Sequence, residues 1–548
     1  MKWHSLLTLS FLLAVLPPLG WAQENKITET LNGITFNANY DNGSLASIEA
    51  GDDDTYRAEI FTENGELGTR RYWFRFSMRG VAGRTVRLII DHEENPRPFI
   101  RLGLGPWRRT TVTEAPDRNT LTFTFNENEN EAEVAFFEPM GYAETLTETE
   151  ALAEPSPHAA TRVLGKSHLG FDLPITEVTD ESIPSNQKHR VWVHSRAHAG
   201  EVTSTHSFLG FLERVVEDSP AGRTLRRYCH FHLVPLLNID GVILGHTRWD
   251  STGHDPEREW CDVTLPEVQL IKNEVDRLMA DPRPIELSLN LHSTKGVYTD
   301  TFFFKHLVPS VSRNFEIIQQ NYIDALNEAS QLFDNRSPGA SQLHPCRFIE
   351  SYFWNGWGES VMALTHEGHF YRRLTDGDWI TGADYRQLGR DLATALIQYF
   401  ELPLDEIAYE DWKDVHFNQF EQVLTSVSGP LADPDSDGYS NLLEYALGLD
   451  PRRTETVPAV TATTDEEDRT HLNFERPLNR TDLRLGLEYS EDLENWTFRE
   501  FSHPDLEATR SARSAGNSKP FSACGSCELA VTQSTLSSSS NSPTASRC

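Results

Sequence analysis

The sequence predicts an α/β domain built on a sheet of mixed strand direction, with a β-sandwich before it and a small β-module after it. In the middle of the chain, apolar strand-like runs alternate with segments of helical apolar spacing. Between about residues 28 and 140, short runs alternate apolar and polar residues and are separated by Gly, Asn and Asp, which is typical of a β-sandwich. From Val457 to about Glu500 a weaker alternation predicts the strands of the small module.

Four apolar strands and three amphipathic helices are expected in the α/β domain. The first two strands form the first part of segments 191–201 and 227–242, the third occupies 285–293 and the fourth lies within 360–370. The helices occupy 202–216, 266–280 and 384–400. The second strand runs into an Asn-x-Asp-Gly turn at Asn238, Asp240 and Gly241. Because loops that follow rigid elements carry most functional side chains, the ends of these strands are where a site is expected.

Two strand ends carry residues that bind metals. His198 and Glu201 stand three residues apart after the first strand, so turn or first-helical-turn geometry puts their side chains on one side. His292 ends the third strand. Two imidazoles and one carboxylate make a zinc site with an open fourth position, which is catalytic in character. In a chain with 20 histidines an HxxE pair alone arises by chance, so the prediction depends on the residues that accompany it.

Two arginines and a glutamate accompany the predicted ligands. Arg248 and Arg258 follow the Asn-x-Asp-Gly turn, and Glu367 stands near the end of the fourth strand. A guanidinium is a permanently charged planar fork that suits carboxylates and oxyanions. A carboxylate beside an activated water can take a proton and pass it to a leaving group.

The order of these motifs resembles that of the zinc metallocarboxypeptidase family, and most closely its cytosolic-carboxypeptidase-like branch. The matching segments read HAGE, VPLLNIDGV, TR, DPEREW and HS before the late Glu367, and the run RYWFRFSM in the preceding β-domain also has a counterpart there. The resemblance implies a zinc-dependent hydrolase that cleaves a C-terminal peptide or isopeptide bond. It implies zinc ligation by His198, Glu201 and His292, oxyanion stabilisation by Arg248, binding of the terminal carboxylate by Arg258, and general base catalysis by Glu367.

One position departs from the family's pattern, because Glu257 stands where the family has Asn immediately before the second arginine. An anionic side chain repels a substrate carboxylate unless it is paired or turned away. Either the substrate lacks a free terminal carboxylate, or Glu257 pairs with Arg258 and orients it. The alternatives are therefore a zinc amidase or esterase on the same fold, or a noncatalytic extracellular binding protein.

The residue preference stays open. Lys295 or Arg347 would receive an acidic side chain, whereas Tyr352, Phe353 or Trp354 would line an apolar pocket.

The N-terminus is typical of an export signal. Residues 1–22 combine Lys2, a short apolar run and a small-x-small cleavage site that ends at Ala22. The mature chain is therefore expected to be periplasmic, secreted or cell-surface, with no integral membrane span. Its formal net charge of −33 argues against nucleic acid and anionic membranes as partners but does not reveal the substrate. Peptide or protein C-termini are the partners that the family resemblance implies.

A second metal signal follows the α/β domain. The run DPDSDGYSNLLE fills the D-x-D-x-D-G-x5-E loop that binds calcium in EF-hands. The expected ligands are Asp433, Asp435, Asp437, the carbonyl of Tyr439, Asn441 and Glu444. We interpret it as a rigid hinge or spacer, and the alternative is an acidic turn without an ion.

These patterns divide the 548 residues into six parts. They are a signal peptide (1–22), a β-sandwich domain (23–150), a zinc carboxypeptidase-like catalytic domain (155–405), an EF-hand-like calcium loop (430–452), a small β-module (455–505) and a Ser-rich tail (506–548) that is expected to be disordered. Cys524 and Cys527 lack the further ligands of a structural zinc site, and disulfide connectivity cannot be derived from the six cysteines.

Overall fold

A computed structural model describes most of the chain from residue 26 onward. The described residues are 26–65, 68–92, 97–294, 301–330, 332–333, 339–341, 347–373, 376–403, 408–455, 459–464, 469–475, 480, 483–490, 497–500, 516–517, 520–522, 526–533 and 545–547. The predicted signal peptide lies outside them. They form two compact units, of which the first comprises the residues up to 217, 226–327 and 332–393, and the second comprises 218–225, 328–331 and the residues from 394 on.

The first unit begins with twelve short strands among its described residues. They are β1 (Thr28–Leu31), β2 (Ile34–Asn37), β3 (Ser47–Ala50), β4 (Thr55–Glu59), β5 (Glu63–Gly65), β6 (Gly68–Arg70), β7 (Arg75–Arg79), β8 (Thr85–Ile90), β9 (Phe99–Leu102), β10 (Arg108–Arg109), β11 (Thr120–Thr124) and β12 (Glu131–Ala135). One sheet has the order β1-β2-β7-β12-β9-β10 and another the order β11-β8-β4-β3, while β5 and β6 pair with each other. Phe36 of the first sheet meets Tyr56 of the second with ring centroids 4.8 Å apart, so apolar faces of the two sheets contact each other.

An eight-stranded sheet carries the rest of the first unit. Its strands are β13 (Ala159–Lys166), β14 (Asp172–Val178), β15 (His189–Ser195), β16 (Cys229–Val234), β17 (Ile285–Ser293), β18 (Phe302–His306), β19 (Gly339–Ser341) and β20 (Met362–Gly368), in the order β13-β14-β16-β15-β17-β20-β18-β19. The central strands β16, β15, β17 and β20 are parallel, whereas β14 runs antiparallel to both of its neighbours and β18 runs antiparallel to β20. The predicted mixed sheet is confirmed, and the parallel strands bring their carboxyl ends to one edge.

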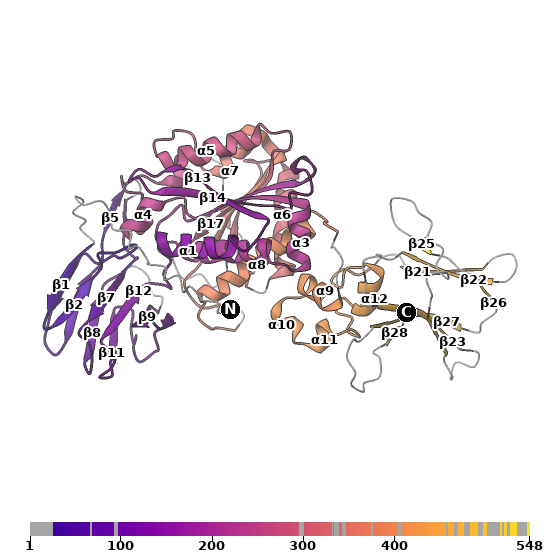
Figure 1. The fold of residues 1–548 in the computed structure, drawn as a ribbon, viewed down its shortest axis with the longest axis horizontal. Coiled ribbons are helices and arrows are strands. Elements are labelled where there is room, and N and C mark those ends of the chain that lie inside the picture. Colours follow the sequence, from indigo (N-terminus) through magenta and orange to yellow (C-terminus); the bar gives the residue numbers. More distant parts are fainter. Residues whose placement is uncertain are drawn as a thin grey trace, which may run out of the picture. The chain divides into compact units, whose positions relative to one another are not determined.

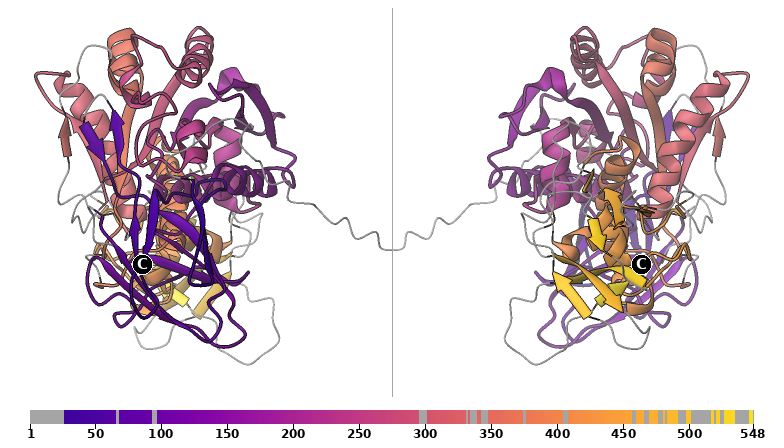
Figure 2. Two further views of the ribbon diagram at one scale, coloured as in Figure 1. Left: turned by 90° about the vertical axis from the view of Figure 1, so that its left-hand side faces the viewer. Right: turned by 90° about the vertical axis from the view of Figure 1, so that its right-hand side faces the viewer.

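Helices cover both faces of this sheet (Figure 1). They are α1 (Tyr142–Ala153), α2 (Thr203–Val216), α4 (Ile239–Leu244), α5 (Pro266–Met279), α6 (Arg313–Ala329), α7 (Ile349–Trp357) and α8 (Gly382–Tyr399), with short 3-10 turns η1 (Ser185–Gln187), η2 (Pro256–Arg258) and η3 (Gly358–Ser360). Helix α3 (Pro220–Tyr228) belongs for the most part to the second unit. Trp192 of β15 packs with Ile271 of α5 and Phe353 of α7 in one buried cluster. Since side chains alternate along a strand, Val191 and Val193 face the opposite side of the sheet. The layers can be followed from two further directions in Figure 2.

The predicted elements of this domain are present, with one correction. The three expected helices correspond to α2, α5 and α8, and the four expected strands to β15, β16, β17 and β20. The prediction of a turn at the Asn-x-Asp-Gly segment is wrong. Asn238 instead caps helix α4, because its side chain accepts a hydrogen bond from the N–H of Gly241, and Asp240 and Gly241 belong to the helix.

Helices α2 and α8 approach closely where each has a glycine. A Cβ atom at Gly210 would lie 1.9 Å from the carbonyl oxygen of Arg386, and one at Gly389 would lie 1.9 Å from that of Ser207. Both obstacles are backbone atoms, so neither can rotate away. The contact holds α2, which begins just after Glu201, against the domain.

Gly389→Ala should therefore destabilise the protein by about 1–3 kcal/mol, because relieving the clash must separate the two helices. Alanine ordinarily stabilises a helix by about 1 kcal/mol over glycine, so the sign itself is informative. The matched control is Gly356→Ala in α7, where an added Cβ has no atom within 4 Å. Urea unfolding midpoints should fall for the first variant and rise slightly for the second, and equal midpoints for both would contradict the packing argument.

The second unit combines short helices with two sheets. Its elements are α9 (Tyr409–His416), α10 (Gln419–Gln422), α11 (Thr425–Ser428), α12 (Asn441–Leu447), β21 (Val460–Thr464), β22 (Arg469–Glu475), β23 (Leu483–Ser490), β24 (Thr497–Glu500), β25 (Gly516–Asn517), β26 (Pro520–Ser522), β27 (Ser526–Gln533) and β28 (Ala545–Arg547). Tyr409 and Trp412 of α9 pack with Leu442 and Tyr445 of α12 in its core.

Where the tail expected to be disordered is described, it includes a paired strand. Strand β27 pairs with β23 along its whole length, from Ser526 opposite Ser490 to Gln533 opposite Leu483. The segment 526–533 reads SCELAVTQ, and its apolar residues suit a strand. The prediction of disorder follows from the serine-rich composition of the whole tail, which hides this short segment. None of the helices among the described residues is both long and apolar enough to cross a membrane.

Candidate active site and metal centre

The segment that carries His198 and Glu201 is held by a buried arginine. It follows β15 and begins with Arg196, which is fully buried and has a left-handed backbone conformation with φ of 61°. The Arg196 guanidinium donates to the carbonyl of Ala199 at 2.7 Å and to the hydroxyl of Thr205 at 2.9 Å. These bonds close the turn around His198. Nothing in the local pattern distinguished Arg196 from a surface arginine.

Three predicted ligands meet at the carboxyl end of the sheet. Nδ1 of His198 lies 2.8 Å from one carboxylate oxygen of Glu201, and Nδ1 of His292 lies 2.8 Å from the other. The two Nδ1 atoms are 3.1 Å apart. All three side chains are buried, so they form a compact inward-facing donor set and not a surface ion pair.

Each of the two histidines has a carboxylate on its far nitrogen. Asp255 Oδ1 lies 3.1 Å from Nε2 of His198, and Glu257 Oε2 lies 3.3 Å from Nε2 of His292. A carboxylate in this position sets the tautomer and orientation of a metal-binding imidazole. The donor set of two oriented imidazoles and one carboxylate therefore fits zinc.

Asp255 also orients Arg248. Its second oxygen accepts from Nε and Nη2 of Arg248 at 3.0 and 2.7 Å, and the free end of the guanidinium, Nη1, lies 3.5 Å from Nδ1 of His198. Burial alone would raise the pKa of Asp255, but the charges of His198 and Arg248 hold it well below its usual value. This aspartate opens the DPEREW motif and was not assigned a role from the sequence.

Two further residues hold the Arg248 loop in position by hydrogen bonds to its backbone. Glu63 of β5 accepts from the backbone N–H groups of Arg248 and Trp249 at 2.9 and 3.3 Å. Asn238 donates to the carbonyls of Ala197 and Arg248 at 3.3 and 3.0 Å, which ties the ligand turn to the arginine loop. Glu63 is far from the site in sequence, so its contribution depends on the fold.

Glu257 does not pair with Arg258, which corrects one of the two explanations offered for it. Its Oε2 accepts from Nδ2 of Asn290 at 3.0 Å and faces His292, and it is 4% exposed. Among the described side chains its ion pair is with His292. The Arg258 guanidinium instead lies over the Phe348 ring at 4.3 Å. Glu257 is thus turned away from the arginine and toward the metal ligand.

Glu257→Gln should lower zinc affinity about 10–100-fold, because the partner of His292 loses its charge. A competition titration with a zinc chelator measures this directly. Glu286→Gln, at a carboxylate that pairs with His189 away from the site, is the control and should bind zinc as the wild type does. Unchanged zinc affinity together with an altered KM for peptides would show that Glu257 acts on the substrate instead.

Glu367 lies beside the ligands. It stands opposite His292 in the parallel register of β17 and β20, and one of its oxygens is buried with no hydrogen-bond partner. Burial first, and then the negative charge of Glu201, raise the pKa of Glu367 to about 8. A bound divalent cation opposes this shift and favours the carboxylate, which is the form that accepts a proton.

A pocket opens on this cluster. It encloses about 140 Å³. Its lining consists of His198, Glu257, Arg258, His292, Phe304, His306, Phe348, Glu350, Thr365 and Glu367. Four residues predicted for the site therefore reach one pocket, while Glu201 and Arg248 contact its wall through His198.

The aromatic residues proposed for a specificity pocket lie elsewhere. Tyr352 donates a hydrogen bond to Asp276, Phe353 belongs to the hydrophobic core, and Trp354 packs on Phe315 at 4.9 Å. Helix α7 points them away from the pocket and contributes Glu350 to it instead. Arg347 is exposed, and Lys295 lies outside the described residues.

Residues 146–345 match the model of the zinc carboxypeptidase family. The chain carries a zinc carboxypeptidase domain. This domain places it among peptide hydrolases, and the match spans the predicted ligands His198, Glu201 and His292.

Curated relatives agree with this assignment. Cytosolic carboxypeptidase 6 of Mus musculus is 23% identical over 407 residues, which cover 67% of this chain and 74% of the relative. Cytosolic carboxypeptidase-like protein 5 of Bos taurus is 29% identical over 257 residues, which cover 37% of this chain and 29% of the relative. Among solved structures, a metallo-carboxypeptidase from Burkholderia cenocepacia aligns with a TM-score of 0.58 and 20% identity over 67% of this chain and 99% of its own. At that identity the likeness concerns the fold.

Proposed function

We propose that this protein is a zinc-dependent metallocarboxypeptidase that hydrolyses a C-terminal peptide or isopeptide bond, with Glu367 as general base. The observation that carries the proposal is the meeting of His198, Glu201 and His292 beside Glu367 in one pocket that Arg258 also lines. A binding module would have no need of a carboxylate with an unpartnered buried oxygen next to an oriented ligand set.

Each side chain has a role in this chemistry. Bound zinc supplies a Lewis acid and makes a water acidic near neutral pH. Glu367 takes one proton of the attacking water and delivers it to the leaving amine, which is the general base and then general acid role. Arg248, held by Asp255, faces the position where the oxyanion develops. Arg258 is the cation for the terminal carboxylate, and its guanidinium lies over the Phe348 ring at the pocket.

The test is mass spectrometry of a C-terminally diverse peptide library incubated with the zinc-loaded protein, beside copies that carry a C-terminal amide. We expect loss of single terminal residues from the free acids only, because Arg258 requires a carboxylate. Equal cleavage of amidated peptides would contradict a carboxypeptidase activity and favour an amidase. No cleavage of any peptide with zinc stoichiometrically bound would favour a nonpeptide substrate or a binding module.

We also propose that the chain is exported and that its N-terminal sheets form the predicted β-sandwich. Support for export comes from the signal-like residues 1–22 and from Cys261, which is disulfide-bonded, since disulfides persist in oxidising compartments. Contact between the sheets through Phe36 and Tyr56 supports the sandwich. Edman sequencing of protein recovered outside the cytoplasm would test export, and a start at Gln23 is expected.

Ca²⁺ is proposed as a second, structural ion, held by the loop at 433–444. Ligand oxygens of Asp433, Asp435 and Asp437 lie within 4.8 Å of one another, and Gly438 turns the loop with φ of 98°. The strongest support is Glu444, which is fully buried while neither of its oxygens has a hydrogen-bond partner. Asn441 turns its amide N–H toward the carbonyls of Val427 and Gly429, so only its side-chain oxygen remains for the ion.

Chelation should destabilise the second unit in a pH-dependent way. Burial and then the charge of Asp435 raise the pKa of Glu444 from about 4.5 to about 9 without an ion. A folded-state pKa above the unfolded value means that stability is fully present below 4.5 and is lost as pH rises toward 9. Calorimetry in chelator should therefore show a melting temperature that falls across this range, and saturating Ca²⁺ should remove the fall. A Glu444→Gln variant should lose the pH dependence, and its persistence there would contradict the assignment.

A further inference from the structure

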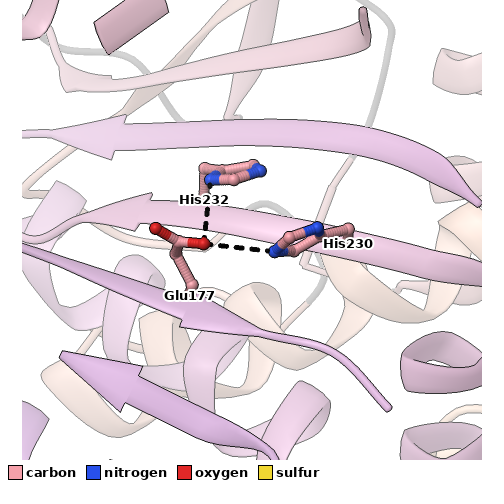
Figure 3. A group of neighbouring side chains, drawn as sticks. All are labelled: Glu177, His230 and His232. Atoms are coloured by element: carbon pink, nitrogen blue, oxygen red, sulfur yellow. Dashed lines mark ion pairs between the residues drawn. The ribbon is translucent and has the colours of Figure 1, made fainter. Parts of the chain in front are cut away.

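A second group of metal-binding side chains lies on the eight-stranded sheet, outside the proposed active site. Glu177 of β14 stands opposite His232 of β16 in their antiparallel register, and His230 precedes His232 by two residues. Residues two apart on a strand share a face, so both imidazoles and the carboxylate lie on one side of the sheet. Figure 3 shows one oxygen of Glu177 facing both rings.

The distances suit a shared ion. Oε2 of Glu177 lies 3.3 Å from Nε2 of His230 and 3.9 Å from Nδ1 of His232. One ligand atom from each residue lies within 4.8 Å of the other two, as in the group at the active site. The imidazole centroids are 4.4 Å apart and their planes are inclined by 32°, so the rings lie nearly side by side with nitrogens toward the same carboxylate.

Hydrogen bonding within the protein leaves this group unsatisfied. His232 is 1% exposed, yet neither of its ring nitrogens has a hydrogen-bond partner, and Nδ1 of His230 is buried without one. Buried polar atoms of this kind are rare in folded proteins and call for an unobserved partner. Burial holds the pKa of His232 well below its usual value. A buried ring nitrogen without a hydrogen-bond partner is where an imidazole can bind a metal.

The surrounding charges permit a cation. A hydrogen bond from His230 is the main cause of the lowered pKa of Glu177. A bound ion would replace this hydrogen bond, because Nε2 of His230 would then give its lone pair to the metal. Arg162 binds the other oxygen of Glu177 at 3.0 Å, which leaves Oε2 for an ion and fixes the carboxylate. The positive charges of Arg162 and Arg277 are themselves offset by Glu274, which contacts each of them at 2.5 Å.

We propose that Glu177, His230 and His232 form a second transition-metal site, with zinc as its ordinary occupant. Two imidazole nitrogens and one carboxylate oxygen are a donor set that zinc accepts, and water fills the remaining position through the partly exposed side of Glu177 and His230. The ion links β14 to β16, and so it stabilises the contact between the antiparallel edge of the sheet and its parallel central strands. It takes no part in peptide hydrolysis.

The test of the site is the number of zinc ions bound per chain. The protein is loaded with zinc and desalted in calcium-saturated buffer, and the retained zinc is measured by elemental mass spectrometry. The wild type should retain two zinc ions. His230→Asn and His292→Asn should each retain one, from opposite sites, and His168→Asn, at an exposed histidine outside both groups, should retain two. His230→Asn should also keep wild-type peptide hydrolysis.

A second measurement separates the site from a folding defect. In the His292→Asn background, Co²⁺ bound at the second site should give a visible absorption band, and adding either His230→Asn or His232→Asn should remove it while the far-ultraviolet circular dichroism stays unchanged. A wild type that retains one zinc, all of it lost in His292→Asn, would overturn the second site and leave the proposed active site intact. Two zinc ions in His230→Asn would overturn it as well.

Discussion

Glu367→Gln should lower kcat for peptide hydrolysis by about 10²–10⁴-fold and leave zinc bound. The amide has nearly the same shape as the carboxylate but cannot take a proton from water. Glu367 stands opposite His292 in the sheet, and the hydrogen bond of His292 Nδ1 is with Glu201. The three donors should therefore keep their positions in the variant. Single-turnover hydrolysis measures the chemical step, and metal analysis of the same sample reports zinc.

The control for this prediction is Glu359→Gln. Glu359 is an exposed carboxylate that accepts hydrogen bonds from Ser312 and Asn314, away from the pocket. It should hydrolyse peptides at the wild-type rate. If Glu367→Gln did so too, the general base would have to be another group, and Glu350, which lines the same pocket, would be examined next.

Asp255→Asn should lower both zinc affinity and kcat/KM, the affinity by about 10–100-fold. One oxygen of Asp255 orients His198 and the other holds Arg248, so a single change loosens a ligand and the oxyanion partner together. Asparagine keeps only one acceptor oxygen and cannot serve both. At saturating zinc the affinity effect disappears, and the remaining loss of kcat/KM then reports the displaced Arg248.

Asp262→Asn, at an exposed position in the following loop, is the matched control and should match the wild type in both assays. An Asp255→Asn variant with normal zinc affinity would mean that His198 keeps its orientation through the backbone alone. A normal kcat/KM at saturating zinc would remove Arg248 from the proposed chemistry.

Local sequence patterns were sufficient for the elements that carry the site. Strands β15 and β17 follow from apolar runs, and the polar residues at their ends identified His198, Glu201 and His292 as a group. The α2, α5 and α8 helices follow from their apolar spacing. Such signals are readable because they repeat within one or two turns of chain.

Residues that position the site were not predictable in this way. Glu63 binds the Arg248 loop from a strand far upstream, and Arg196 closes the ligand turn with contacts to backbone carbonyls. Nor did the pattern indicate that Glu257 faces His292, since a carboxylate next to Arg258 in sequence suggests a pair with it. These contacts form only once the chain has folded.

The sequence by itself determined which chemistry this protein carries, because the identities and order of His, Glu and Arg residues at strand ends are written in the chain. Tertiary structure alone decided how those residues are held. The direction of each polar side chain depends on strand register and on partners distant in sequence, as Asp255 between His198 and Arg248 shows. The same reason explains why the Glu177, His230 and His232 group was not anticipated: two ordinary strands acquire it only when they pair.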